Sequence, residues 1–504
     1  MPKNALSKCL IANRGEIAVR IIRACRELGT GMVAVYSDAD ASARHVLMAD
    51  EAVAIGAAPA QQSYLRVERL IDAALSTGCD CVHPGYGFLS ESEVFAQAVI
   101  DAGLVWIGPP PSAIRAMGVK TEARALMAAA GVPLVPGFQS ENADDATFAA
   151  AAEQIGYPVM VKAAGGGGGK GIRIVRAAGD LYEALAAARH EAGAAFGDAR
   201  VFLERYIERG RHIEIQVLAD AHGNTIHLCE RECSAQRRHQ KVIEETPAPH
   251  LDDATRTQMG ATAVAAARAV GYVNAGTVEF IVTPDGAFYF LEMNTRLQVE
   301  HPVTELVTGV DLVKLQFAIA AGAPLPLAQA DVRQHGHAIE CRVYAEDPHS
   351  GFLPATGTIL RFVPPSAPGV RVDSGVQTGD AISIHYDPML AKIIVHDRTR
   401  TDTIARMQQA LRETMLLGLT TNVAFLQTLL AHPTFAAGTV DTGFIDRELD
   451  ALLPATSAPP LAALIAAALT EMHAQSVQVN ERAESVDHDP WARGDGFRIG
   501  STSS

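Results

Sequence analysis

The sequence predicts a protein of mixed α/β and α+β class that begins with a doubly wound parallel sheet. Over roughly the first 115 residues, short apolar runs alternate with stretches of helical periodicity, the pattern of a parallel sheet covered by helices. A proline-rich break at residues 108–112 ends this pattern. Hairpin-like pairs of apolar runs then follow near residues 201–232 and 276–293, which indicates mixed α and β structure.

The expected elements of the first domain, residues 1–118, follow from these runs. The strands are the apolar segments 9–12, 32–36, 81–83 and 105–107, and the helices are the periodic segments 16–28, 67–75 and 94–100. A second domain is expected over residues 119–325.

A third domain, residues 335–446, has short strands between Gly and Pro turns and then a helix over 401–417. Residues 447–504 are expected to form a linker-like tail, because an Ala/Leu-rich stretch gives way to polar residues there.

Composition excludes several classes of protein. A net charge of −15 argues against general binding of nucleic acid or of anionic membranes, since both need a broad basic surface. No apolar run reaches the ~18 residues of a membrane span. The 7 cysteines contain no C-x-x-C pair, which favours reduced thiols over disulfides. We therefore expect a cytoplasmic protein without nucleic-acid or membrane partners. A zinc site at Cys229 and Cys233 is disfavoured, because no second Cys/His pair accompanies them.

The richest polar stretch follows the expected strand that starts near residue 286. Glu292 and Asn294 lie two apart and share one face of that strand, and Glu279 on the partner strand would lie beside them. Such an all-oxygen cluster suits Mg²⁺ held with phosphate oxygens. Arg296, Gln298 and Glu300 continue as a second i, i+2, i+4 row, which suits a small anion. The alternative is a solvated hairpin edge on which charges alternate by chance.

A glycine-rich loop follows the strand expected at residues 156–162. Its backbone N–H groups could surround phosphate oxygens, with Lys162 and Lys170 as counter-charge. The loop is not a Walker A motif, because Ala164 and Gly171 replace its first Gly and its Ser/Thr. A flexible linker is the alternative reading. The loop consists of Gly165, Gly166, Gly167, Gly168, Gly169, Lys170 and Gly171.

A donor-rich loop is expected at residues 230–241, because one dense group of donors in an acidic protein suggests capture of a small anion or of phosphates. The alternative is a solvated basic turn. The turn at residues 83–88 carries Tyr86 at a strand end, where α/β sheets place ligands. The donors are Gln236, Arg237, Arg238, His239 and Lys241.

Seven segments between about residues 5 and 446 together closely resemble biotin carboxylase, an ATP-grasp ligase. The resemblance implies a doubly wound N-terminal domain, an ATP-grasp domain with a mobile Gly-loop lid at about 131–205, and a C-terminal domain. It also implies that ATP and bicarbonate form carboxyphosphate and that the carboxyl group passes to N1′ of biotin. The segments are IANRGEIAVRIIRAC, HPGYGFLSE, AAGGGGGKG, ERECSAQRRHQKVIEE, EMNTRLQVEHPVTE, GHAIECRVYAEDP and YDPMLAKIIV.

The resemblance also implies site residues, position by position. The nucleotide would be bound by the Gly165–Gly171 loop together with Lys120, Lys162, Glu204, Arg205, Ile207, His212, Gln236 and His239. Mg²⁺ (or Mn²⁺) would be bound by Glu279, Glu292 and Asn294. Bicarbonate would be bound by Lys241, Arg296, Gln298 and the backbone of Val299, with Glu300 as the general base. Biotin would contact Arg342, whose charge stabilises the enolised form, and Tyr86, which lies beside the ring.

The partners implied are a biotin carboxyl carrier domain or protein and a carboxyltransferase subunit, in a homodimer or a larger hetero-oligomer. The family presents its biotinyl lysine in a Met-Lys-Met hairpin, and the sequence has no Met-Lys pair. Biotin is therefore expected as a carried substrate, on a part missing from a truncated chain or on another chain. The segment 489–500 resembles the linker of methylcrotonoyl-CoA-type subunits.

Three other functions compete with this interpretation. Another ATP-grasp ligase would activate a different carboxylate, and a silent nucleotide-binding scaffold would have lost part of the metal or base set. A nicotinamide-dependent oxidoreductase rests only on a G-x-G-x-x-G match inside the glycine run, which such a run generates by itself.

Overall fold

The computed structural model describes residues 6–140, 143–164, 172–238, 240–455, 458–459 and 461–483. The chain divides into two units, Met1–Leu453 and Pro454–Ser504. In the second unit the described structure is helix α17 (Leu461–Ala483). Among the described residues, no helix is both long and apolar enough to cross a bilayer.

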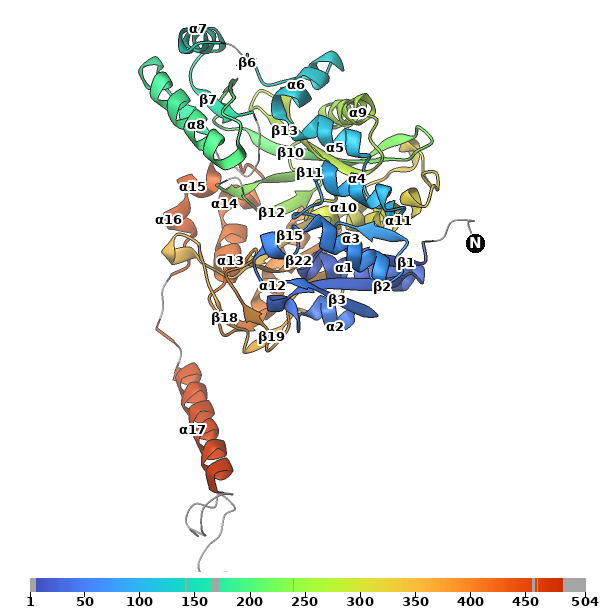
Figure 1. The fold of residues 1–504 in the computed structure, drawn as a ribbon. Helices are drawn as coiled ribbons and strands as arrows, with labels where there is room; N and C mark the ends of the chain where they lie inside the picture. The colour runs from blue at the N-terminus through green and yellow to red at the C-terminus, as the bar shows by residue number, and fades with distance from the viewer. Residues whose placement is uncertain are drawn as a thin grey trace, which may run out of the picture. The chain divides into compact units, whose positions relative to one another are not determined.

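The N-terminal part is the predicted doubly wound sheet (Figure 1). Its 5 strands are parallel, in the order β3-β2-β1-β4-β5. Strand β3 was not expected, because its sequence EAVAIG is short and mostly exposed or half-exposed. The strands are β1 (Lys8–Ile11), β2 (Gly31–Ser37), β3 (Glu51–Gly56), β4 (Cys81–His83) and β5 (Val105–Trp106). The helices are α1 (Gly15–Leu28), α2 (Arg44–Met48), α3 (Val67–Ser76), α4 (Glu93–Asp101) and α5 (Pro111–Gly118).

The centre of the molecule is an antiparallel sheet of 8 strands, in the order β14-β13-β10-β11-β12-β15-β22-β20. The last three strands belong to the expected third domain, so that domain continues the sheet of the second. Local patterns could not reveal this join, because β12 pairs with β15 across about a hundred residues. The strands are β10 (Arg211–Ala219), β11 (Thr225–Arg237), β12 (Gln240–Thr246), β13 (Asn274–Val282), β14 (Phe288–Asn294), β15 (His337–Tyr344), β20 (Val370–Ser374) and β22 (Met389–Asp397).

A separate sheet of 4 strands, in the order β6-β9-β7-β8, lies in the region expected to form the lid. The hairpin expected near residues 201–232 is formed by β10 and β11, whereas β9, at the start of that range, pairs with β6 and β7. Figure 1 shows helices α7 and α8 beside this sheet, at one end of the first unit. The elements are β6 (Gly137–Gln139), β7 (Val159–Ala163), β8 (Arg173–Val175), β9 (Val201–Arg205), α7 (Asp145–Ile155) and α8 (Leu181–Phe196).

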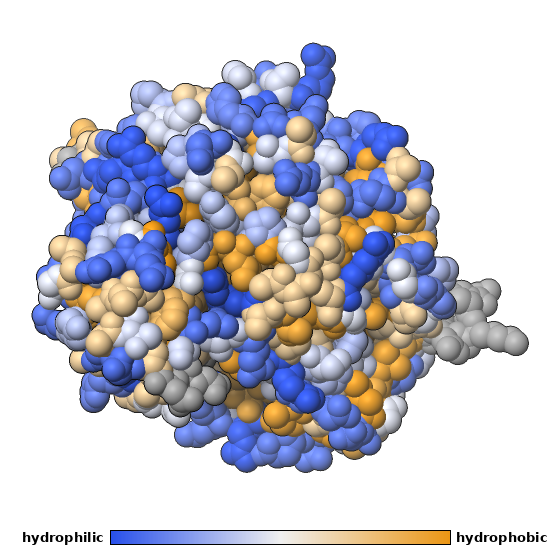
Figure 2. Space-filling model, turned by 90° about the horizontal axis from the view of Figure 1, so that it is seen from above, coloured by the Kyte–Doolittle hydropathy of each residue, from blue (hydrophilic) through white to orange (hydrophobic). Residues whose placement is uncertain are grey.

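Helices pack on the 8-stranded sheet, among them α9 on β11, α10 on β15 and α12 on β22. The helix expected over 401–417 ends earlier, at Glu413, because residues 415–417 form strand β23 against β19. Seen from above, the molecule carries apolar residues interspersed with hydrophilic ones (Figure 2). The helices are α6 (Lys120–Ala129), α9 (Asp253–Ala269), α10 (His301–Thr308), α11 (Leu312–Ala320), α12 (Arg400–Glu413), α13 (Val423–Ala431), α14 (Pro433–Ala436), α15 (Phe444–Arg447) and α16 (Leu449–Leu452). Short strands are β16 (Glu346–Asp347), β17 (Leu353–Pro354), β18 (Gly357–Thr358), β19 (Arg361–Val363), β21 (Ala381–Ile382) and β23 (Met415–Leu417).

Candidate active site

A cleft of about 1200 Å³ is lined by residues from every part of the first unit. The lid sheet contributes Lys162 and Glu204, the N-terminal part contributes Tyr86, and the strands β13 and β15 contribute Glu279 and Arg342. Most of the residues expected to bind ligands line this cleft: Tyr86, Lys120, Lys162, Glu204, Arg205, Ile207, His212, Gln236, Lys241, Glu279, Glu292, Asn294, Arg296, Gln298, Val299 and Arg342. The expected residues Gly165–Gly171, with Lys170, and His239 lie outside the described residues.

At the lid end of the cleft, the two expected phosphate-binding lysines that the structure describes are each paired with a carboxylate. Lys120, the first residue of α6, donates to Glu292 Oε2 over 3.0 Å. Lys162 on β7 pairs with Oε2 of Glu204, and Arg124 pairs with the other oxygen of the same carboxylate. The positive charge of both lysines is therefore balanced by carboxylates of the protein itself at this end of the cleft.

The acidic hairpin has the predicted geometry. Glu279 on β13 lies opposite Glu292 on β14, and Asn294 donates from Nδ2 to Glu279 Oε1 over 2.8 Å. Glu279 is buried, whereas the side chain of Glu292 is 43% exposed. The hairpin thus presents two carboxylates and an amide on one face at the cleft.

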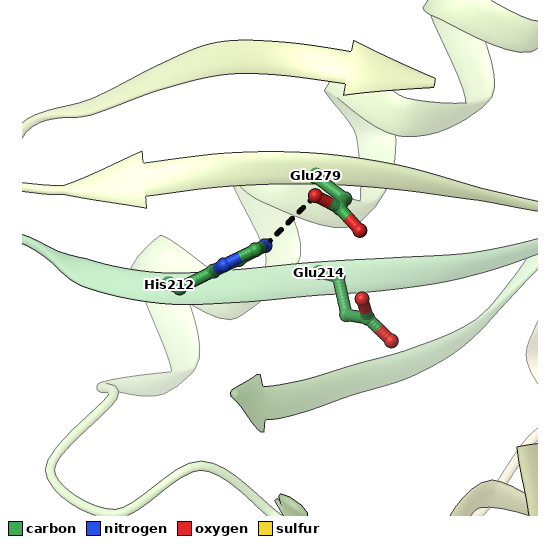
Figure 3. Close-up of side chains that lie close together, drawn as sticks. All are labelled: His212, Glu214 and Glu279. Carbon is green, nitrogen blue, oxygen red and sulfur yellow. Dashed lines mark ion pairs between the residues drawn. The ribbon is translucent and has the colours of Figure 1, made fainter. Parts of the chain in front are cut away.

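A second group of possible metal ligands lies deeper on the same sheet: His212, Glu214 and Glu279 (Figure 3). His212 and Glu214 share a face of β10, and His212 Nε2 lies 3.0 Å from Glu279 Oε2. Burial lowers the pKa of His212, but the Glu279 carboxylate outweighs it and raises the pKa above its usual value. The imidazole and Glu279 therefore stabilise each other as an ion pair.

Lys241 on β12 joins three buried carboxylates. Its Nζ lies 2.6 Å from Glu214, 2.9 Å from Glu279 and 2.6 Å from Glu300. Burial lowers the pKa of this lysine, and the three carboxylates raise it well above its ordinary value. Lys241 is therefore a fixed cation between the acidic hairpin and the expected base.

Sequence reasoning missed Arg231 and its partner Glu214. Arg231 is fully buried and pairs with Glu214, while its Nη1 donates to Gln216 over 2.7 Å and to Thr304 over 2.9 Å. One signal was available: His212, Glu214 and Gln216 alternate within an otherwise apolar strand, which places three polar side chains on one face.

The expected second row of the anion site is not extended strand. Strand β14 ends at Asn294, and the chain turns irregularly until helix α10 begins at His301, so Arg296, Gln298 and Glu300 do not alternate on a strand face. Arg296 instead donates to Glu91 over 2.9 Å, to Gln298 over 3.0 Å and to Asn294 over 3.1 Å. Glu91, from the N-terminal part, was also missed.

Glu300 lies behind the cleft surface and is fully buried. Its Oε2 accepts from Arg342 Nη2 over 2.9 Å, and Arg342 Nε donates to Glu244 over 2.6 Å. Burial raises the pKa of Glu300, but the charges of Lys241, Arg342 and Arg231 hold the pKa well below its usual range. Burial is also the main reason that the pKa of Glu244 rises to about 7.

The donor-rich segment is a hairpin of strands, which corrects the expected loop. Strand β11 continues to Arg237 and β12 starts at Gln240, so ladder hydrogen bonds hold most of the segment. Gln236, Arg238 and Lys241 reach the cleft, whereas Arg237 packs on the ring of Phe352 at 4.0 Å. The density of charged residues indicated a loop, because buried charges are rare in strands.

The residues fit a divalent cation at the acidic hairpin. Glu279, Glu292 and Asn294 supply oxygen atoms, the ligands that Mg²⁺ and Mn²⁺ accept.

Three family models match consecutive parts of the chain. The model "Biotin carboxylase, N-terminal domain" matches residues 5–114, "Carbamoyl-phosphate synthase L chain, ATP binding domain" matches residues 119–328, and "Biotin carboxylase C-terminal domain" matches residues 340–447.

Known relatives agree with these matches. Biotin carboxylase 1 of Bacillus subtilis is 52% identical over 88% of this chain and 98% of its own length. The mitochondrial methylcrotonoyl-CoA carboxylase subunit alpha of Dictyostelium discoideum is 48% identical over 98% of this chain and 70% of its own length. The chain covers 64% of the rice subunit of that name, so it spans about two thirds of such subunits.

Solved structures share the fold. The biotin carboxylase domain dimer of Hydrogenobacter thermophilus 2-oxoglutarate carboxylase, crystallised with MgADP, ADP and bicarbonate, has a TM-score of 0.87 and 45% identity over 90% of this chain and 100% of that one. The Campylobacter jejuni biotin carboxylase complex with βγ-ATP has a TM-score of 0.86 and 43% identity over 88% of this chain and 99% of that one. The chain therefore belongs to the biotin carboxylase family of ATP-dependent ligases.

Proposed function

We propose that this chain carboxylates biotin with ATP and bicarbonate, the first half-reaction of a biotin-dependent acyl-CoA carboxylase. The observation that carries the proposal is the position of Lys241 and Arg342, which line one cleft and bind the same buried carboxylate, Glu300. This arrangement places fixed positive charge and a proton acceptor at one point, which the joining of two anionic substrates requires.

The nucleotide occupies the lid end of the cleft. Lys120 and Lys162 exchange Glu292 and Glu204 for phosphate oxygens, while Glu204, Arg205 and Ile207 meet the adenine. Glu279, Glu292 and Asn294 hold Mg²⁺ or Mn²⁺, which neutralises charge on the phosphates when bound. His212 and Gln236, which line the same cleft, lie around the nucleotide. His239 and the Gly165–Gly171 loop are proposed to complete this site.

Bicarbonate is bound by Lys241, Arg296, Gln298 and the backbone of Val299, and Glu300 takes its proton. An oxygen of bicarbonate then bonds to the γ-phosphorus of ATP while the bond to ADP breaks, which gives carboxyphosphate and ADP. The low pKa of Glu300 keeps its carboxylate ionised. For proton transfer, Glu300 must first exchange at least one of its two cations for the substrate.

Biotin enters beside Tyr86 and Arg342. The guanidinium of Arg342 stabilises the negative charge on the enolised ureido oxygen as N1′ loses its proton. The carboxyl carbon bonds to N1′ as its bond to the phosphate oxygen breaks, and the phosphate released takes up the N1′ proton. Tyr86 lines the cleft and packs beside the biotin ring.

The biotin is carried by a biotin carboxyl carrier domain or protein, and a carboxyltransferase subunit completes transfer to an acyl-CoA. Relatives named as methylcrotonoyl-CoA carboxylase subunits support this class of assembly, as a homodimer or a larger hetero-oligomer. A cytoplasmic location is proposed from the cysteines, all 7 of which are free thiols.

The test is ATP cleavage by the purified 504-residue chain with and without bicarbonate and free biotin. We expect cleavage only with Mg²⁺ and bicarbonate, and free biotin should raise the rate and become carboxylated. A rate unchanged after rigorous removal of bicarbonate would favour a ligase for another carboxylate.

The carrier proposal has a separate test. The chain with ATP, bicarbonate and free biotin should leave acyl-CoA unchanged, because every catalytic group assigned here serves ATP, bicarbonate or biotin. A biotinylated carrier with a carboxyltransferase of the methylcrotonoyl-CoA type should restore acyl-CoA carboxylation. Carboxylated acyl-CoA from the 504-residue chain alone would contradict the division into two sites.

A further inference from the structure

The loop between β14 and α10 carries the proposed bicarbonate site, and two buried side chains fix its consecutive carbonyl groups. Nδ1–H of His301 donates to the carbonyl of Gln298 over 2.8 Å. Nζ of Lys392 donates to the carbonyl of Val299 over 2.7 Å. The orientation of the Val299–Glu300 peptide is therefore set by a lysine on β22.

Lys392 is fully buried, so its charge needs a partner. The partner is Glu16 in the first turn of α1, whose Oε1 lies 3.2 Å from Lys392 Nζ. The chain after β20 packs closely against the start of α1, since a Cβ at Gly375 would lie 2.5 Å from the backbone nitrogen of Glu16.

Glu16 has a second partner from the opposite side of the site. The hydroxyl of Tyr86, the aromatic proposed to meet biotin, donates to the same Oε1 that faces Lys392. A continuous chain of contacts therefore runs from Tyr86 through Glu16 and Lys392 to the carbonyl of Val299.

We propose that Lys392 and Glu16 are positioning residues for the bicarbonate half-reaction. Lys392 orients the Val299–Glu300 peptide, and with it the Val299 backbone and the Glu300 carboxylate, while Glu16 keeps Lys392 charged and in place. Neither residue is among those assigned to ATP, and the inference rests on the proposed bicarbonate site.

The experiment compares Lys392→Met, Glu16→Gln and the double variant. Each single variant leaves one buried charge without its partner, so thermal unfolding should occur at a lower temperature. The double variant removes both charges and should recover most of this loss. A purely structural pair would regain its activity together with its stability.

We expect the double variant to keep a KM for bicarbonate at least tenfold above wild type, with the KM for ATP within about twofold. Arg256→Met is the matched control. Arg256 Nε lies 3.0 Å from Oε1 of buried Glu230, and neither residue lines the cleft. That control should lower stability and leave the KM for bicarbonate unchanged.

A wild-type KM for bicarbonate in the double variant would overturn the inference, as would an equal rise in the KM for ATP. If the double variant does not fold, Glu16→Gln alone decides, because it keeps the shape of the side chain. Wild-type protein that cleaves ATP without bicarbonate would instead refute the proposed function, so the two failures are distinguishable.

Discussion

The Nη2 atom of Arg342 donates to Oε2 of Glu300 over 2.9 Å, so the side chain proposed to face biotin also holds the side chain proposed to deprotonate bicarbonate. The other oxygen of Glu300 accepts from Lys241 over 2.6 Å. Both oxygens are thus bound by cations that are proposed to serve different substrates. In the proposed mechanism the two half-reactions share one carboxylate, so changes to its partners should affect each half differently.

Glu300→Gln should lower bicarbonate-dependent ATP cleavage by about 10²–10⁴-fold, because the amide keeps the shape but cannot take a proton. Affinity for a non-hydrolysable ATP analogue, measured by calorimetry, should stay near wild type. Glu230→Gln is the matched control, since Glu230 is also fully buried and paired with an arginine. Equal rates in the two variants would exclude Glu300 as the base.

Arg342→Met should separate the two half-reactions. Carboxylation of free biotin should fall by a larger factor than bicarbonate-dependent ATP cleavage, because the enolate loses its fixed counter-charge. Both products can be measured in one reaction, as ADP and as labelled carboxybiotin. Equal loss of both activities would show that Arg342 acts on a shared step.

The same variant should change the pH dependence of ATP cleavage. Burial raises the pKa of Glu300, and Lys241, Arg342 and Arg231 lower it to well below the ordinary value. Removal of one of these cations raises the pKa, so the carboxylate takes up its proton at a higher pH. As pH falls, Arg342→Met should therefore lose activity at a higher pH than wild type. A midpoint that moves to lower pH would contradict this.

Chelation of divalent metal should abolish ATP cleavage, and Mg²⁺ or Mn²⁺ should restore it. Glu279→Gln should raise the metal concentration that gives half the maximal rate, because one anionic oxygen ligand is lost. Glu230→Gln again serves as control. A Glu279→Gln enzyme with the metal dependence of wild type would place the metal elsewhere.

Arg231→Met should lower the free energy of unfolding by about 3–5 kcal/mol, because it leaves Glu214 buried with one cation fewer. Chemical denaturation measures this change. Arg447→Met removes a half-exposed pair with Asp441 and should cost only about 0–1 kcal/mol. Similar losses in both variants would mean that burial does not set the strength of the pair at Arg231.

Local sequence patterns predicted those parts of the molecule whose partners are close in the chain. Glu279 and Glu292 lie on strands joined by a short turn, so alternation alone placed them opposite each other. Near residues 201–232 the pattern indicated a hairpin, which β10 and β11 form, but it did not reveal that β9 pairs with β6 and β7, which lie earlier in the chain. Residues 295–300 were misread, because i, i+2 spacing is uninformative once the strand has ended.

The buried charges were the other feature that the sequence patterns did not predict. Arg231 lies in a strand where local rules expect apolar residues, and only the fold shows that Glu214, Gln216 and Thr304 surround it. Glu91 approaches Arg296 from the N-terminal sheet region, about two hundred residues earlier in the chain. No local pattern connects residues so distant.

The pairing of β12 with β15 has a consequence for how such an enzyme can be divided. A gene split in the segment between residues 325 and 335 would give two polypeptides, each with a bare sheet edge that is complementary to the other. Arg342 would lie on one fragment and Glu300 on the other, so activity would return only when the fragments reassociate. The recovered activity would therefore measure how far the β12–β15 pairing has re-formed.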